Sequence, residues 1–202
     1  MLIPKLDHLG FGLVGHLRQD NPGVRGRTYV TLFVNTPARQ TARLFTVIVG
    51  NPQAPRVATS CYFRTDFTDG TRMITSNNKT VPTTPQSPRT REGSISLPAF
   101  GDISVLYQIH EAAIARYASD GARVFPDMTD PASYLRSSIN EELENWIEHR
   151  YYYLDEQEHA LRPTWKGAVI MGLRVSFPSR WIREKLRRWR AKRLLRELEI
   201  AT

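Results

Sequence analysis

The sequence predicts an α+β fold, in which an antiparallel β-meander is packed by helices and followed by a basic C-terminal helical tail. Strand-forming segments occur at residues 24–78 and amphipathic helical patterns at residues 102–161, with a proline-rich loop at residues 79–93 between them. Such a separation of strands from helices along the chain is typical of α+β proteins. We therefore expect one α+β domain over residues 1–161 and a basic helical tail over residues 162–202.

Four segments of the first half have the composition of strands. Thr28–Val34 and Leu44–Val49 are rich in β-branched and aromatic residues and have apolar side chains on both faces, as central strands do. Val57–Phe67 alternates between the two faces, and Arg72–Ser76 follows it. The Asp-Gly dipeptide at residues 69–70 predicts a hairpin between these two segments, because glycine tolerates the positive φ of a tight turn. The four segments therefore predict a meander.

A glycine pattern near the N-terminus has the spacing of a dinucleotide-binding loop. Residues 10–15, GFGLVG, match G-x-G-x-x-G, which binds a pyrophosphate between the strand and the helix of a βαβ unit. Here Asn21, Pro22 and Gly23 interrupt the chain soon afterwards, and no βαβ pattern follows. We therefore predict a glycine-rich turn or a loosely formed N-terminal helix, and no cofactor.

Helical periodicity begins after the proline-rich loop. A first helix is predicted from Asp102 to Ser119, and its apolar stripe includes His110. A second helix is predicted to begin at Asp130, an N-cap that is followed by proline at the first helical position. The apolar stripe of the second helix consists of Leu135, Ile139, Leu143, Trp146 and Ile147, and its outer face carries four glutamates. Both helices therefore have one face suited to packing on the sheet.

Three further elements are predicted after the second helix. Tyr151–Leu154 and Ala160–Arg162 can pair as a short hairpin. Thr164 then caps a helix over Trp165–Phe177, and a last helix covers Ser179–Glu199.

The formal net charge of +8 is distributed unevenly along the chain. Residues 1–101 have a net charge of +7, residues 102–161 a net charge of −8, and residues 162–202 a net charge of +9. The acidic segment can neutralise one of the two basic segments within the protein. The other basic segment then remains to face a negatively charged partner outside.

The cysteine content and the N-terminus indicate a cytoplasmic protein. Cys61 is the single cysteine, so an intramolecular disulfide is impossible and a secreted disulfide scaffold is excluded. The N-terminal residues lack the basic start and the long apolar run of a signal peptide. No apolar run approaches the roughly 20 residues that span a bilayer. We expect the cytoplasm as the location, with the inner face of the membrane as the place where the tail binds.

The basic tail combines cations with tryptophan. Residues 162–196 contain twelve basic side chains and a single acid, Glu184, together with Trp165, Trp181 and Trp189. Tryptophan beside lysine and arginine is the composition favoured at a membrane interface. Each cation contributes about 1 kcal/mol near an anionic leaflet, so several together can hold a peripheral protein.

Two apolar groups lie on different sides of the last predicted helix. At 100° per residue, one group contains Trp181, Ile182, Leu186 and Trp189. The other group, nearly opposite, contains Ala191, Leu194, Leu195 and Leu198. We predict that one group docks on the protein itself, partly against the acidic segment, and that the group with the tryptophans makes the external contact.

The predicted function is that of a non-catalytic intracellular accessory or interaction protein whose tail contacts an anionic surface, namely membrane headgroups. The residues expected to make this contact are Arg174, Arg180, Trp181, Arg183, Lys185, Arg187, Arg188 and Trp189. The alternative is electrostatic binding of nucleic acid by the same residues, because arginine-rich helices also neutralise phosphates. An acidic protein partner and a basic helix that only packs on the acidic segment are further alternatives. The sequence does not determine the oligomeric state.

A third hypothesis places an enzyme site near His110. A histidine in an apolar setting, with Glu111 adjacent, could act as a general base, whereas a structural core histidine would bond to a backbone carbonyl. Cys61 likewise could be a nucleophile or a small hydrophobic residue in the middle of a strand. The five histidines have no metal-ligand spacing, so we predict no metal site.

Two stretches of the chain resemble a group of uncharacterised bacterial proteins. They are FTDGTRMITSN at Phe67–Asn77 and RPTWKGAVIMGL, with its arginine-rich continuation, from Arg162 onward. The resemblance covers roughly the second two-thirds of the chain. Members of the group tend to carry an N-terminal hydrophobic segment, so the resemblance implies membrane association, although this chain shows no such segment. It implies no activity and no catalytic residue.

Overall fold

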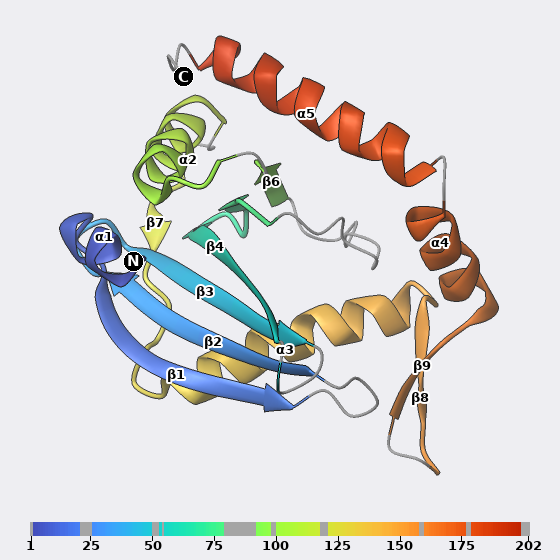
Figure 1. The fold of residues 1–202 in the computed structure, drawn as a ribbon. Coiled ribbons are helices and arrows are strands. Elements are labelled where there is room, and N and C mark those ends of the chain that lie inside the picture. The colour runs from blue at the N-terminus through green and yellow to red at the C-terminus, as the bar shows by residue number, and fades with distance from the viewer. Residues whose placement is uncertain are drawn as a thin grey trace.

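The computed structural model describes residues 2–20, 26–49, 53, 55–78, 92–97, 100–117, 121–157, 160–176 and 179–198. In this part of the chain a mostly antiparallel sheet is accompanied by helices, and the C-terminal helices run along one side of the molecule (Figure 1). The predicted α+β class is therefore confirmed. Most of the predicted loop at residues 79–93 lies outside the described residues.

The described strands of the main sheet follow one another in the order β1-β2-β3-β4-β5-β6, and β7 pairs with β4. Their bounds are β1 (Gly12–Asp20), β2 (Gly26–Asn35), β3 (Gln40–Val49), β4 (Arg56–Phe67), β5 (Arg72–Ser76), β6 (Glu92–Ser96) and β7 (Arg123–Val124). The four successive pairs from β1–β2 to β4–β5 are antiparallel, which confirms the predicted meander.

The first strand corrects the prediction for the N-terminal glycine pattern. A short helix, α1 (Ile3–His8), precedes it, and Gly10, at a φ of +82°, turns the chain into β1. Gly12 then pairs with Val34 of β2, and the pairing continues over the length of β1. The glycines and polar residues of β1 give it a weak strand propensity of its own, so pairing with β2 determines its structure.

The last strand of the path, β6, also differs from the prediction, because its first residues fall in the predicted loop. It pairs in parallel with β5, and Ser94 lies beside Ile74. Parallel neighbours need a long connection, so no local turn pattern in the sequence announces this pairing.

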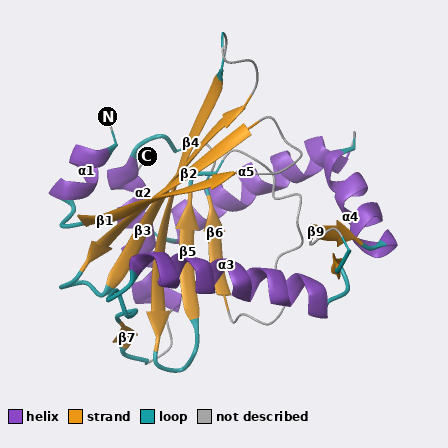
Figure 2. Cartoon of the chain, turned by 90° about the horizontal axis from the view of Figure 1, so that it is seen from below, coloured by secondary structure: helices purple, strands orange, loops and turns teal. Residues whose placement is uncertain are grey.

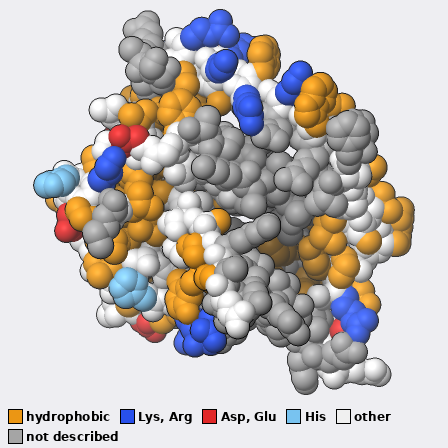
Figure 3. Space-filling model, in the orientation of Figure 1, with side chains coloured by type: hydrophobic (Ala, Val, Ile, Leu, Met, Phe, Trp, Pro, Cys, Tyr) orange, Lys and Arg blue, Asp and Glu red, His pale blue; other side chains and the backbone are white. Residues whose placement is uncertain are grey.

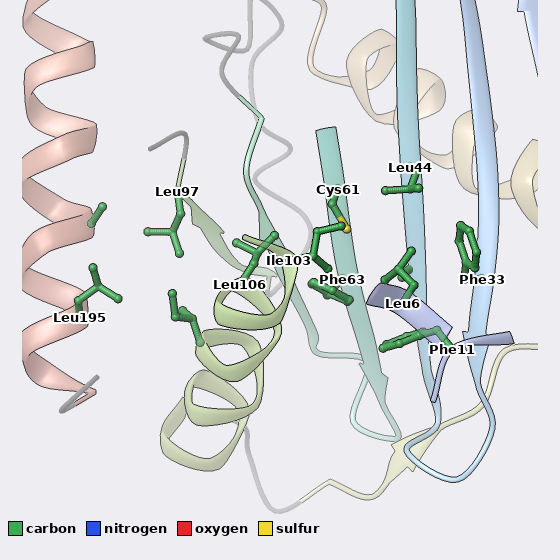
Figure 4. Packing of buried hydrophobic residues seen from close by; sticks show 13 residues of the cluster. Leu6, Phe11, Phe33, Leu44, Cys61, Phe63, Leu97, Ile103, Leu106 and Leu195 are labelled. Carbon is green, nitrogen blue, oxygen red and sulfur yellow. The ribbon is translucent and has the colours of Figure 1, made fainter. Parts of the chain in front are cut away.

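The two faces of the sheet carry separate apolar clusters. On one face, Phe33 and Phe63 belong to one buried cluster with Leu6 of α1 and Leu106 of α2 (Ile103–Tyr117). Figure 4 shows these side chains converging between the sheet and α2. The predicted first helix is thereby confirmed as a core helix.

The other face of the sheet is covered by α3 (Pro131–Glu148), which runs across the strands in Figure 2. Leu135 of α3 packs with Val30 and Leu32 of β2. Further along the helix the predicted apolar stripe is less buried than expected, and Ile147 is exposed. The reason is that the C-terminal part of α3 extends beyond the sheet (Figure 2).

The C-terminal elements follow the predicted order. They are the hairpin of β8 (Tyr152–Asp155) and β9 (Ala160–Pro163), then α4 (Trp165–Val175) and α5 (Ser179–Glu197). The hydroxyl of Thr164 accepts a hydrogen bond from the backbone N–H of Gly167 at 3.1 Å, which confirms the predicted N-cap. The predicted ends of the two helices, Phe177 and Glu199, lie outside the described residues. The predicted domain boundary at residue 162 stays a prediction.

Candidate functional site

One end of α5 is anchored in the hydrophobic core. Ala191 and Leu195 are buried and belong to the same cluster as Leu97, Ile103 and Leu106. In Figure 4, Leu195 points from α5 toward Leu97 and α2. Burial of a leucine side chain contributes about 2 kcal/mol, so this contact holds α5 in one rotation about its axis.

The opposite side of α5 faces solvent. Trp181 and Trp189 are 52% and 54% exposed, and Ile182 and Leu186 are exposed to a similar degree. The prediction that one apolar group of this helix docks on the protein is therefore confirmed. The group that carries the tryptophans is the one left outside.

Cations lie beside both exposed tryptophans. The ammonium of Lys185 lies 4.0 Å from the ring centroid of Trp181, and the guanidinium of Arg193 lies 5.9 Å from that of Trp189. Arg193 also pairs with Glu197 at 2.7 Å, four residues along the helix. Figure 3 shows Lys and Arg side chains and hydrophobic side chains next to one another in the region of α5. A cation over an indole ring keeps both groups together at the surface.

The residues predicted for the contact divide into two sets. Trp181, Lys185, Arg188 and Trp189 have described side chains, and all four are exposed. Arg174 lies on α4, and Arg180, Arg183 and Arg187 lie on α5, but the side chains of these four arginines fall outside the described part of the structure.

The structure adds a second exposed apolar surface, on α4. Trp165 is 81% exposed, and Val169 and Leu173, four and eight residues later, are also exposed. Trp165 was predicted only as part of the tryptophan-rich composition of the tail. The spacing of four residues was the pattern that could have identified this surface.

A close backbone contact seats α4 against the turn that follows α3. A Cβ atom at Gly167 would lie 2.0 Å from the carbonyl oxygen of Tyr151, so only glycine fits there. The hydroxyl of Tyr152 also lies 3.0 Å from the sulfur of Met171 on the same side of the helix. These contacts fix which side of α4 is turned inward.

The acidic segment pairs with the N-terminal half of the chain. Its described ion pairs with that half join Asp102 to Lys5 and Glu141 to Arg72, each at 3.2 Å. By contrast, the described contact between α5 and α2 is apolar, supplemented by a hydrogen bond from the Tyr117 hydroxyl to Glu197 at 3.2 Å. At its start the tail also pairs with the acidic segment, since Arg162 lies 2.8 Å from Asp155 within the β8–β9 hairpin. The predicted docking of the tail on the acidic segment therefore occurs, and for α5 it is provided by burial of Ala191 and Leu195.

His110 is a buried core residue. Its Nε2 lies 3.0 Å from the Thr65 hydroxyl and its Nδ1 lies 2.9 Å from the Thr75 hydroxyl, so its partners are side chains and not the expected backbone carbonyl. Burial lowers the pKa of His110 from 6.5 to about 3, and the charge of Arg123 adds to this effect. With no exposed surface, its ring nitrogens are out of reach of a substrate in this structure.

Cys61 is likewise enclosed in the core cluster beside Phe63. Burial raises the pKa of the Cys61 thiol to about 12, although a backbone hydrogen bond partly opposes this. A nucleophilic cysteine needs an exposed sulfur and a lowered pKa, and Cys61 has neither. It packs as a small hydrophobic residue.

Comparison of the chain with protein-family models, with curated proteins and with solved structures finds no match. Among the described helices, none has the length and apolar character needed to cross a membrane. In the same residues, no three His, Cys, Asp or Glu side chains are grouped as metal ligands. The exposed surfaces of α4 and α5 are therefore the features from which function is inferred.

Replacement of Gly167 by alanine tests the seating of α4. The added methyl group meets the Tyr151 backbone, so we expect Gly167→Ala to destabilise the protein by about 1–3 kcal/mol. The matched control is Gly172→Ala on the same helix, where, among the described residues outside the helix's own backbone, no atom lies within 4 Å of the new Cβ. That variant should be neutral or gain up to about 1 kcal/mol from helix propensity. The free energy of unfolding, measured with a denaturant, distinguishes the two. Equal effects would contradict the close contact.

The burial of His110 predicts a dependence of stability on pH. In the unfolded chain His110 binds a proton near pH 6.5, whereas in the folded protein it does so only near pH 3. The free energy of unfolding should therefore fall as the pH drops through this interval. The slope contributed by one histidine is at most about 1.4 kcal/mol per pH unit. His110→Gln should flatten the curve of unfolding free energy between about pH 5 and 6.5, above the range of carboxylates. Equal slopes for the variant and the wild type would show that His110 is not held neutral.

Proposed function

We propose that the protein is a non-catalytic intracellular accessory protein that binds peripherally to anionic membranes through α5. The observation that carries this proposal is the rotation of α5, which buries Ala191 and Leu195 and leaves Trp181 and Trp189 at the surface. Indole rings at the level of lipid headgroups are favoured, because the ring is apolar and its N–H is polar. The exposed side of α5 therefore has the chemistry of a membrane interface.

The cations of α5 add an electrostatic contribution. Lys185, Arg188 and Lys192 are exposed on the same helix. At about 1 kcal/mol for each cation near an anionic leaflet, these three contribute on the order of 3 kcal/mol. Cytoplasmic leaflets contain anionic lipids, so the proposal places the protein at the inner face of a membrane.

The rest of the charge distribution favours the same orientation. The acidic helix α3 and the basic helix α5 lie across the molecule from one another in Figure 1. Glu144 and Glu148 of α3 are exposed. An anionic surface attracts the side with α5 and repels the side with α3, so the protein approaches the membrane with α5 first.

Nucleic acid is the alternative partner, since the same cations neutralise phosphates. The exposed side chains of Ile182 and Leu186 favour lipid over nucleic acid. Aliphatic side chains contribute nothing to phosphate neutralisation, whereas at a lipid boundary they bury apolar surface.

Vesicle binding tests the proposed contact. The full chain should float with vesicles that contain phosphatidylserine and should not float with purely zwitterionic vesicles. Trp181→Ala combined with Trp189→Ala should weaken binding by about tenfold or more, because both rings lose their interfacial burial. Lys185→Glu should weaken it and reduce its dependence on salt.

The matched controls for vesicle binding lie on β1 and β2, across the molecule from α5 in Figure 1. Leu13→Ala removes an exposed hydrophobic side chain of β1, and Arg27→Glu reverses an exposed charge of β2. Both control variants should bind vesicles as the wild type does. Flotation of the tryptophan variant at the wild-type level would exclude α5 as the contact. Binding to a DNA duplex without binding to vesicles would assign the cations to nucleic acid.

A further inference from the structure

The side of α4 formed by Trp165, Ala168, Val169, Gly172 and Leu173 is apolar along its whole length. We call it the outer face of α4. Val169 and Leu173 are 51% and 56% exposed, and Trp165 is exposed further. Ala168 and Gly172, which lie between them, are exposed as well. At 100° per residue these five residues occupy one continuous side of the helix, with no polar side chain among them.

Lys166 directs its charge away from the outer face of α4. Its ammonium donates a hydrogen bond to the carbonyl oxygen of His149 at 3.0 Å and lies 4.7 Å from the ring centroid of Tyr151. Tyr151 is also the residue against which Gly167 packs, so these partners lie on the inner side of α4. The outer face of α4 thus differs from the exposed side of α5, where cations surround the tryptophans.

The outer face of α4 lies on a helix that is next to α5 in the fold. The two helices contact each other and together form one corner of the molecule (Figure 1). Hydrophobic side chains cover the edge of the molecule where α4 lies, while Lys and Arg side chains gather in the region of α5 (Figure 3). A lipid leaflet can bind both surfaces at the same time, because its anionic headgroups attract the cations of α5 and its hydrocarbon accommodates the apolar side chains of α4.

We propose that α4 inserts its outer face between lipid headgroups while α5 lies on them, so that the protein selects anionic membranes with loosely packed lipids. This inference rests on the function proposed for α5. A helical face without cations gains affinity only by burying apolar surface in the headgroup and acyl boundary. Space for such insertion exists where unsaturated chains or strong curvature separate the headgroups.

The test compares vesicles of equal phosphatidylserine content that differ in acyl chains and diameter. We expect the full chain to bind small vesicles with unsaturated chains at least about threefold more tightly than large vesicles with saturated chains. Val169→Ser combined with Leu173→Ser should abolish this preference and retain binding that depends on anionic lipid. Both side chains are exposed, so the variant should fold, and an unchanged far-UV circular dichroism spectrum verifies this.

Different failures identify different errors. Wild-type protein that binds anionic vesicles without regard to packing would overturn the insertion of α4 and leave the role of α5 intact. The insertion of α4 would also be overturned if the serine variant kept the wild-type preference for loosely packed lipids. It would equally be overturned if sedimentation showed that the wild type is a dimer and the serine variant a monomer. Absence of binding to every anionic vesicle would overturn the proposed function itself. Leu13→Ser on β1 is the matched control and should keep the preference.

Discussion

The docking of Ala191 and Leu195 on the core is the contact on which the surface of α5 depends. A helix is a rigid rod with 100° between successive residues, so burial of one side determines what the other side presents. With Leu195 against Leu97 and α2, the tryptophans and their cations are turned outward. Without this contact, a highly basic helix would have no preferred rotation, and its tryptophans would form no continuous surface.

The position of α4 follows from a second close contact, between Gly167 and the Tyr151 backbone. Together with the Thr164 cap, it joins α4 to the turn after α3 and leaves Trp165 exposed. A contiguous exposed apolar surface, such as Trp165 forms with Val169 and Leu173, is typical of interaction sites. The fold thus holds two different surfaces, one cationic and one apolar, at a single corner of the molecule (Figure 1). Such a combination suits a lipid interface.

Local patterns predicted the elements that depend on local interactions. The Thr164 cap and the hairpin before it follow from neighbouring residues, as do the two faces of α5. β1 and β6 were missed because their pairing partners supply the information that their own residues lack. The burial of His110 was one of two stated alternatives, but its threonine partners come from β4 and β5, which no spacing along the chain reveals. The outer face of α4 was missed although its spacing was visible, because only the tryptophans were considered.

Hydrogen exchange of the full chain, with and without anionic vesicles, tests the central claim most directly. Without vesicles, amides near Ala191 and Leu195 should be protected together with those of α2, since both belong to one core. With vesicles, further protection should be confined to α4 and the segment from Trp181 to Trp189. Uniformly fast exchange along α5 without vesicles would contradict the account, because no fixed side would then exist. Protection on the sheet instead of on these helices would contradict the proposed contact.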